Sequence, residues 1–272
     1  MERQQVAHRV DNRYRVRGLL LATSAIRVGS SLAMSGITGN PIARDASGRP
    51  YLPGSTLKGA FRGTVERVIP SLNVADLRSC GLSGANRVDC ISVSGDRQAQ
   101  FASLTGDERI VYLRDHLCTT CALFGSPVVA GRVRFADLTL PEGWTDRGEI
   151  RDGVAIDRDT DRAIERRRYD IEVLPAGTPF FCTLHAEGLT ETDLGILAIG
   201  LLELAHGGMV LGGGKSHGFG RCQLEIEAIE RVRFGVEHRA EFLAYLRDGS
   251  MAPTDSTPLA FLAERLDALL AA

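Results

Sequence analysis

Residues 210–222 read VLGGGKSHGFGRC and join a helical pattern to a strand pattern. Before this loop, TETDLGILAIGLLELAH (190–206) predicts a buried helix with Thr190 or Thr192 as its N-cap. After it, RCQLEIEAIERV (221–232) alternates apolar and polar side chains, which predicts a half-buried strand. The glycine-rich loop therefore connects a helix to a strand.

The GKS within this loop looks like part of a Walker phosphate-binding loop, but its spacing and context do not fit. A Walker loop has a glycine five positions before the glycine of GKS, where this chain has Met209 before Gly214. A Walker loop also runs from a strand into a helix. ATP or GTP binding is therefore not expected. Two interpretations remain: a loop that holds a polyphosphate backbone across a sheet edge, or a flexible connection.

The composition is typical of a globular protein. The chain has 272 residues, 44% hydrophobic and 24% charged, with a formal net charge of -2. Its N-terminal residues lack an apolar signal-peptide region, and no run of eighteen apolar residues occurs. We therefore expect neither secretion nor a membrane partner, and a cytoplasmic location.

Lysine is scarce and its positions are informative. Only Lys58 and Lys215 among the 32 basic residues are lysines, and both lie in glycine-bearing segments. A GC-rich genome, which favours arginine codons, explains the scarcity but not the positions. Glycine-rich backbone that carries a cation is suited to close contact with an anion.

Two further segments have clear periodicity. Residues 12–23, NRYRVRGLLLAT, alternate arginines with Tyr14 and Val16 and predict a first strand. Residues 55–69 predict a helix with Ser55 as N-cap and with Lys58 and Arg62 sharing one polar face. The start of this helix could bind an RNA phosphate through its N–H groups and these two cations, or be an ordinary surface helix.

Four cysteines suggest a metal site. Cys80, Cys90, Cys118 and Cys121 have the spacing C-x9-C-x27-C-x2-C, and the last pair resembles a zinc knuckle. His116 could replace one ligand, and unliganded buried cysteines are the alternative. A structural zinc ion would close an insertion with little apolar content. The other two cysteines, Cys182 and Cys222, fall on apolar strand faces and are expected in the core.

Several motifs in consistent order resemble the RAMP superfamily of CRISPR-associated proteins. They are TSAIRVGS, NPIARDASGRPYLPGSTLKGAFR, CTTCALFGS, GRVRFADL, VAIDRDTDRAIERRRYDIEVLPAGTPF and GGGKSHGFGR, which together cover most of residues 12–232. The chain is most similar in pattern to backbone subunits of type III effector complexes, or complexes derived from them. The resemblance implies an antiviral defence protein that binds guide RNA.

The fold implied is α+β, a ferredoxin-like (RRM-like) core with insertions in a single domain. The expected core comprises residues 12–69, 127–141 and 176–232. A zinc-type insertion is expected at about 70–126, a β-hairpin "thumb" at about 142–175, and a helical tail at 235–272.

The resemblance also implies RNA-contacting residues. In related filaments the thumb wedges into the duplex of guide and target RNA, and Val154 and Ile156 are the candidate apolar wedge between arginines. The expected RNA contacts are Arg44, Ser55, Lys58, Arg62, Val154, Ile156, Arg158, Arg166, Arg167, Arg168, Gly212, Gly213, Gly214, Lys215, His217 and Arg221.

Target cleavage in catalytic members depends on an aspartate, and this chain has Gly39 at the position that we align with it. Asp45 matches a second, loop-ordering aspartate. We therefore expect a subunit without its own cleavage activity, whose partners are guide RNA, target RNA, copies of itself in a head-to-tail filament and other effector subunits, with or without a separate nuclease. The alternative is a metal-dependent endoribonuclease that cuts target RNA at regular intervals.

Overall fold

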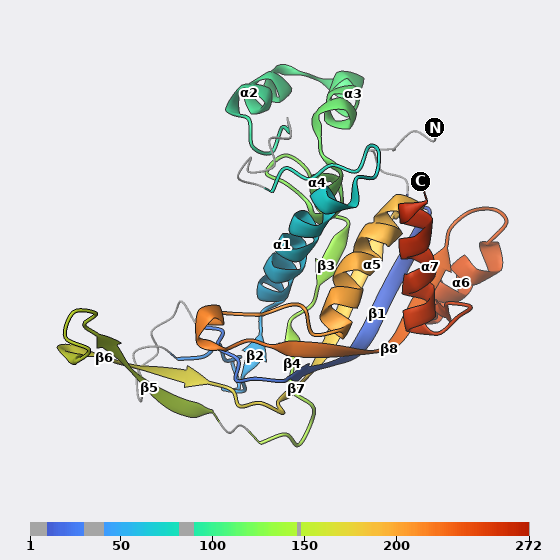
Figure 1. The fold of residues 1–272 in the computed structure, drawn as a ribbon. Coiled ribbons are helices and arrows are strands. Elements are labelled where there is room, and N and C mark those ends of the chain that lie inside the picture. Colours follow the sequence, from blue (N-terminus) through green and yellow to red (C-terminus); the bar gives the residue numbers. More distant parts are fainter. Residues whose placement is uncertain (1–9, 30–40, 82–89, 146–147, 272) are drawn as a thin grey trace.

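Two strand–helix–strand units interleave to form the core of the molecule (Figure 1). A computed structural model describes residues 10–29, 41–81, 90–145 and 148–271, without the side chains of residues 155 and 163–168. In chain order the elements are β1 Asn12–Ala22, β2 Tyr51–Leu52, α1 Gly54–Leu72, α2 Gly95–Ser103, α3 Gly106–His116, α4 Thr119–Phe124, β3 Val133–Phe135, β4 Leu138–Thr139, β5 Glu149–Ile156, β6 Ala163–Val173, β7 Pro179–Glu187, α5 Glu191–Ala205, a 3-10 turn Lys215–His217, β8 Cys222–Arg233, α6 Arg239–Asp248, β9 Ala252–Pro253 and α7 Pro258–Leu270.

The main sheet is antiparallel, with the strand order β2-β4-β7-β1-β8-β9 and with β3 also paired to β7. One unit is β1, α1 and the β3–β4 pair, and the other is β7, α5 and β8. Because β1 lies between β7 and β8, each unit contributes a strand to the centre of the other. This is the ferredoxin-like arrangement expected from the sequence.

Alternating side chains fix the register of the central strands. Tyr14 and Val16 of β1 are buried. The residues that alternate with them, Arg13, Arg15 and Arg17, lie on the opposite, open face of the sheet. The pairing with β8 shifts between Arg17 and Gly18. A Cβ on Gly18 would lie 2.2 Å from the carbonyl oxygen of Glu225, so this bulge requires glycine.

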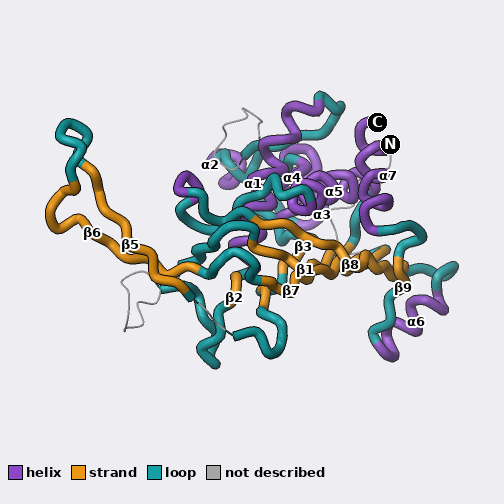
Figure 2. The backbone as a smooth tube through the Cα atoms, turned by 60° about the horizontal axis from the view of Figure 1, so that its bottom comes forward, coloured by secondary structure: helices purple, strands orange, loops and turns teal. Residues whose placement is uncertain are grey.

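The helices α1, α5 and α7 cover one face of the sheet, as Figure 2 shows. The helix α5 is the central one and is buried along most of its length. Thr190 is its N-cap, one of the two predicted, and forms a capping box with Asp193, in which the side chain of each accepts a hydrogen bond from the backbone of the other. Gly200 allows close packing on α1, since a Cβ there would lie 2.2 Å from the ring of Phe61.

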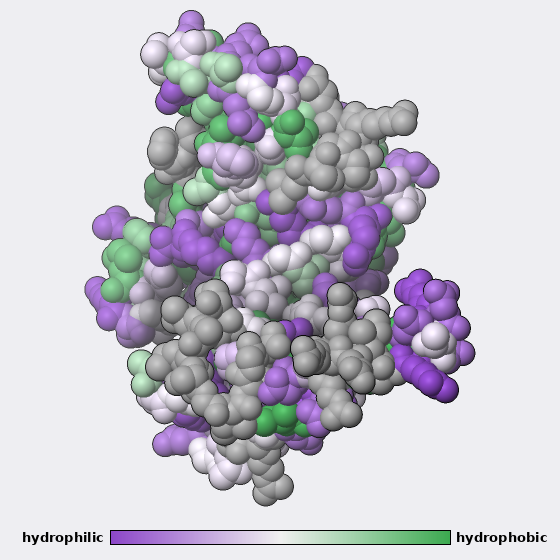
Figure 3. All heavy atoms as spheres, turned by 90° about the vertical axis from the view of Figure 1, so that its left-hand side faces the viewer, coloured by the Kyte–Doolittle hydropathy of each residue, from purple (hydrophilic) through white to green (hydrophobic). Residues whose placement is uncertain are grey.

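The hairpin of β5 and β6 forms a separate two-stranded sheet that projects from the body (Figures 1 and 2). Figure 3 views the molecule from this side. Hydrophilic residues predominate among its coloured atoms, and the hydrophobic residues form small separate patches.

Some sequence expectations need correction. The helix α1 begins at Gly54 with Pro53 as its N-cap, so the prediction of Ser55 as N-cap was wrong. The cysteine-bearing insertion contains three helices, α2 to α4, that periodicity did not predict. The helical tail expected at 235–272 contains two helices, α6 and α7. Among the described residues, no helix is both long and apolar enough to cross a membrane.

Candidate nucleic-acid interface and metal site

The glycine-rich loop has a defined shape. Its centre is the 3-10 turn of Lys215 to His217, which lies between Gly214 and Gly218, both at positive φ. Lys215 and His217 are exposed. Gly212 has a φ of +78°, and a Cβ there would lie 2.1 Å from the carbonyl oxygen of Arg27. The loop is therefore packed closely against a neighbouring segment, which does not fit the interpretation as a flexible connection.

That neighbouring segment, residues 25–29, connects the parts of the candidate interface. The N–H of Gly213 donates to the carbonyl of Arg27 at 2.9 Å, and the N–H of Gly220 donates to that of Ala25 at 2.8 Å. On the other side, Ala43 N–H donates to the carbonyl of Val28 at 2.9 Å. We define residues 25–29 as the connecting segment, which joins the glycine-rich loop to the chain that leads into β2 and α1.

The base of the thumb is attached to the same place. Ile26 of the connecting segment exchanges backbone hydrogen bonds with Leu174 at 2.8 and 2.9 Å. The guanidinium of Arg151 lies 5.7 Å from the ring centre of Phe219, which also packs against the small buried cluster of Ala25, Ile171 and Val173. Phe219 therefore links the hairpin to the glycine-rich loop.

The candidate wedge residues lie on the projecting part of the thumb. Val154 is 41% exposed and Ile156 is 60% exposed. Arg158 is also exposed, near a turn in which Asp157 accepts the N–H of Thr160 at 2.9 Å. The side chains of Arg166, Arg167 and Arg168 lie outside the described residues.

The start of α1 differs from the free anion site that we expected. The N–H of Gly54 donates to the carboxylate of Asp137 at 2.7 Å, so the first N–H of the helix already has an anionic partner. A Cβ on Gly54 would lie 2.2 Å from the carbonyl oxygen of Phe135. Ser55 is exposed and Lys58 is half-buried on the first turns. In Figure 1 the N-terminal end of α1 and the glycine-rich loop both lie toward the side of the molecule from which the thumb projects.

Arg62 does not share an accessible face with Lys58. Arg62 is 8% exposed, and its guanidinium donates to Glu66 at 2.7 Å, to the carbonyl of Gly125 at 2.7 Å and to the sulfur of Cys121 at 3.2 Å. Burial acts to lower the pKa of Arg62, but the hydrogen bond to Glu66, its charge and the contact with Cys121 together outweigh burial, and the pKa is raised. Arg62 stays charged inside the protein. The expectation that it contacts RNA is therefore corrected: it faces the cysteine-bearing insertion.

Arg44 and Asp45 precede a tight turn on the chain leading to β2. Arg44 donates to Glu172 of β6 at 2.6 Å, a contact that joins this chain to the thumb. The carboxylate of Asp45 accepts the N–H groups of Ser47 and Arg49 at 2.8 and 2.9 Å. Asp45 thus has the contacts of a loop-ordering residue. Gly39 lies outside the described residues.

The four predicted cysteines come together. The sulfur atoms of Cys80, Cys90, Cys118 and Cys121 all lie within 4.8 Å of one another, and all four residues are buried. Tetrahedral ligation with metal–sulfur bonds of about 2.3 Å places sulfur atoms about 3.8 Å apart, so these residues fit a metal ion. Hydrogen bonds from Cys118 and Cys121 lower the pKa of the Cys90 thiol. The four cysteines could therefore hold a metal ion.

His116 is not a member of this group of ligands. Its Nδ1 lies 2.6 Å from the guanidinium of Arg97, and its ring packs on Tyr112 with the centres 4.3 Å apart.

The remaining cysteines behave as core residues, as predicted. Burial raises the pKa of both Cys182 and Cys222 to about 12.

The sequence reasoning missed two residues that shape the interface. Phe219 joins the thumb to the glycine-rich loop, and an aromatic residue between two glycines was a usable signal. Glu172 binds both Arg44 and the N–H of Ile42, at 3.0 Å for the latter. Its position on a charged strand gave no such signal, because its partners lie far away in the chain.

Comparison with known proteins agrees with this architecture. No curated protein matches the chain. The family model of the RAMP superfamily matches residues 20–223, more than half of the 272 residues and a span from β1 to the start of β8. The fold, the glycine-rich loop and the motif order are those that the resemblance led us to expect. The chain belongs to the RAMP superfamily.

Proposed function

We propose that this protein is a backbone subunit of a CRISPR effector complex of type III or a type III-derived kind, which binds guide RNA and presents it for pairing with target RNA. Membership of the RAMP superfamily gives it a CRISPR-associated role in RNA binding. The observation that carries the finer proposal is the connecting segment. Its hydrogen bonds hold the glycine-rich loop, the base of the thumb and the chain before α1 at one end of the central strands, where β1 ends and β8 begins.

This end of the sheet offers phosphate contacts of two kinds, cationic side chains and accessible main chain. Lys215, His217 and Arg221 are exposed on or beside the ordered loop, and Lys58 lies on the first turns of α1. Because Gly212, Gly213 and Gly214 have no side chains of their own, a ligand can approach the main chain closely there. Such a combination of cations and accessible main chain suits a sugar–phosphate backbone without reading its sequence.

The thumb has a different part in the proposal. Its exposed Val154 and Ile156 would insert between base pairs of the guide–target duplex, and Arg158, with Arg166, Arg167 and Arg168, would contact phosphates. Unstacking a base step costs a few kcal/mol, which phosphate contacts have to offset. The attachment of the hairpin base through Phe219 and through the Arg44–Glu172 pair would keep the wedge in position.

Repeated copies would bind head to tail along one guide, with other effector subunits at the ends. The four clustered cysteines would hold a structural zinc ion, because a closed set of four thiolates is typical of such sites. The ion would fix three short helices that have only a small apolar cluster of their own.

Target cleavage is the second candidate function. Asp45 is an exposed carboxylate near the interface, which is what favours this alternative. Both N–H groups that it accepts belong to its own turn, so we assign it to loop ordering. We therefore propose a subunit that does not cut RNA. Regularly spaced cuts in a guide-complementary RNA with Mg²⁺ or Mn²⁺, lost on Asp45→Ala, would establish the alternative instead.

Guide retention tests the main proposal. The protein is co-expressed with a repeat-spacer array and purified, and the bound RNA is sequenced and its affinity measured against salt concentration. For Lys58→Ala with Lys215→Ala we expect weaker binding and a salt slope smaller by about 0.7 for each lost phosphate contact.

The control is Arg247→Ala on α6, which removes one cation from an exposed position away from the interface. Its slope should equal that of the unaltered protein. If the double lysine variant retains guide RNA with an unchanged slope, the proposed interface is wrong.

A further inference from the structure

The insertion that carries the four cysteines meets the core through α4, which contacts α1. Its helix α4 has six residues, and the cluster residues Cys118 and Cys121 lie at the N-cap and in the first turn of this helix. The insertion has its own small apolar cluster, separate from the main core. Leu123 and Phe124 at the end of α4 pack in the main core, and Phe124 contacts the ring of Phe61 on α1. Polar contacts to α4 act beside this packing to hold the cysteine cluster against the rest of the molecule.

Arg62 makes one of these contacts from α1. One guanidinium nitrogen donates to the sulfur of Cys121 at 3.2 Å and another to the carbonyl of Gly125, the C-cap of α4, at 2.7 Å. The third nitrogen binds Glu66 one turn further along α1, at 2.7 Å. A planar guanidinium satisfies all three partners at once, which an ammonium group cannot do with the same geometry.

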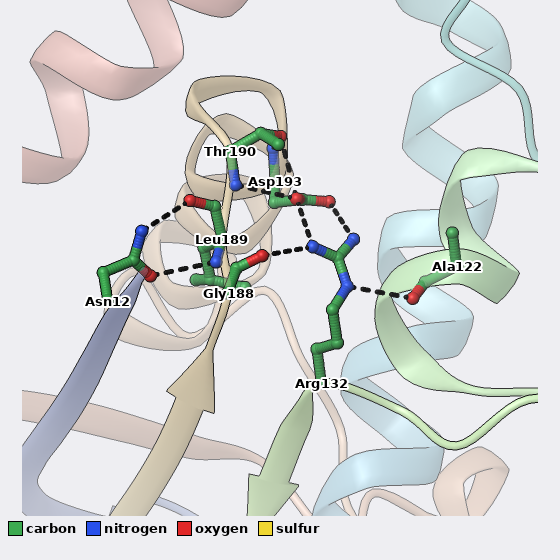
Figure 4. A network of polar contacts seen from close by, with 7 residues as sticks. All are labelled: Asn12, Ala122, Arg132, Gly188, Leu189, Thr190 and Asp193. Carbon is green, nitrogen blue, oxygen red and sulfur yellow. Dashed lines mark hydrogen bonds and ion pairs between the residues drawn. The ribbon is translucent and has the colours of Figure 1, made fainter. Parts of the chain in front are cut away.

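A second arginine also contacts α4, as Figure 4 shows. Arg132 donates to the carbonyl of Ala122 at 3.2 Å and forms two 2.7 Å bonds to the carboxylate of Asp193 on α5. Asp193 is 2% exposed and also accepts the N–H of Thr190. Arg132 contacts only backbone in α4, whereas Arg62 contacts a cluster sulfur directly.

The charge of the cluster makes the Arg62 contact important. Four thiolates around a divalent cation have a net charge of -2, and a buried charge is costly unless it is hydrogen-bonded or paired. An N–H group from a guanidinium gives a thiolate both a hydrogen bond and a positive neighbour. Partners of this kind, next to the ligands, orient them and tune the affinity for the metal.

We propose that Arg62 is a positioning residue for the metal site: it holds the Cys121 thiolate in place and joins the metal-bound insertion to α1, the helix that carries Lys58. The assignment rests on the metal site of the proposed function but not on RNA binding. It gives Arg62 a role different from the phosphate contact that its spacing from Lys58 predicted.

Metal release tests this role. Zinc-loaded protein is mixed with an excess of a chromophoric chelator, and the rate of release is followed by absorbance. We expect Arg62→Met to release the metal about 10- to 100-fold faster than the unaltered protein. Arg62→Lys keeps the positive charge beside Glu66 but loses the planar geometry. Its rate of metal release should therefore lie between that of the unaltered protein and that of Arg62→Met.

The control is Arg67→Met, on the same helix. Arg67 is exposed and its guanidinium donates to Thr64 at 3.2 Å, within α1 itself. Its release rate should match that of the unaltered protein. Cobalt-substituted protein adds a readout that a purely structural role would not change: in Arg62→Met the sulfur-to-cobalt charge-transfer band should move to lower energy, because Cys121 loses a hydrogen-bond donor.

Unchanged release and an unchanged band in both Arg62 variants would overturn the proposal. If Arg62→Met does not fold, Arg62→Lys decides by the same two measurements. A protein that binds no metal at all would overturn both this proposal and the zinc assignment. If the double lysine variant retains guide RNA with an unchanged salt slope, the RNA interface is wrong but the Arg62 measurements are unaffected. The two proposals can therefore fail independently.

Discussion

Gly220 is a residue whose local geometry makes the glycine-rich loop possible. Its φ is +86°, its N–H donates to Ala25 at 2.8 Å, and a Cβ would lie 1.9 Å from the carbonyl oxygen of Leu211. Gly218 has a similar φ of +85° but nothing within 4 Å of a Cβ. An alanine at position 218 would therefore cost backbone strain alone, whereas an alanine at position 220 would cost backbone strain and a steric clash.

We expect Gly218→Ala to cost about 1–2 kcal/mol of unfolding free energy, from the left-handed backbone alone. Gly220→Ala should cost more than that, because the loop has to move away from Leu211 as well, and guide RNA should bind more weakly. Denaturant unfolding of both variants gives the comparison. Equal losses in the two variants would mean that the loop does not pack closely against its neighbours.

Glu230 gives a prediction on pH. Burial acts to raise the pKa of this carboxyl, but hydrogen bonds from Arg15 at 2.6 Å and Arg17 at 3.2 Å outweigh it and lower the pKa from 4.5. A group whose pKa is depressed on folding stabilises the fold above its unfolded pKa, and this stability is lost as the pH falls through the folded pKa.

The unaltered protein should therefore be more stable than Glu230→Gln at neutral pH, and the difference should disappear below the folded pKa. Thermal unfolding of the two proteins over a pH series measures this, with Glu237→Gln as a control for removing one negative charge from a surface loop. A stability difference between the two proteins that stays constant down to low pH would contradict a lowered pKa for Glu230.

At the scale of elements, the thumb combines a buried base with an exposed end. Val173 at the base is fully buried and Ile171 is 7% exposed, whereas Val154 and Ile156 are exposed. For Val154→Ser with Ile156→Ser we expect unfolding free energy within about 0.5 kcal/mol of the unaltered protein. Guide RNA should be retained, and pairing with target RNA should become weaker because the wedge is lost.

Ile171→Ala is the matched variant at the base and should destabilise the docking of the hairpin by about 2–5 kcal/mol. Hydrogen exchange of β5 and β6 and target-binding assays distinguish the two variants. Target pairing that is unaffected by the serine substitutions would remove Val154 and Ile156 from the proposed interface.

The long periodic elements were predictable from the sequence, and the insertion was not. The strand β1 and the helix α5 have strong alternation or a strong capping signal, and both lie where the sequence places them. The helices α2 to α4 are short and form around the cysteine cluster, which a local pattern does not reveal. The spacing of the cysteines did predict that they come together.

Arg62 shows why the site itself was only partly predictable. Helical geometry correctly places it one turn from Lys58, but the pattern does not say which polar face the insertion folds back onto. Cys121 and Gly125 are about sixty residues away in the chain, so their contacts with Arg62 leave no local signal.

At the scale of the whole molecule, the insertion should depend on its metal while the sheet should not. Removal of the ion by a chelator leaves four buried thiols and a small apolar cluster to hold residues 90–121. We expect amide exchange in these residues to become at least about tenfold faster, a local loss of about 1.4 kcal/mol. Exchange in β1 and β7 should be unchanged. Equal exchange with and without metal would show that the cluster is stable without an ion.

The ion pairs on the open face of the sheet have a consequence for how RNA approaches. Arg15 and Arg17 are paired with Glu230, and Arg13 lies 3.3 Å from Glu187. Within the described ranges, by contrast, no carboxylate forms an ion pair with Lys58 or Lys215. A polyanion that reaches Lys58 or Lys215 therefore displaces no carboxylate, whereas on the open face it has to compete with Glu187 and Glu230. We therefore expect the first contacts with RNA to form at these lysines rather than on the open face.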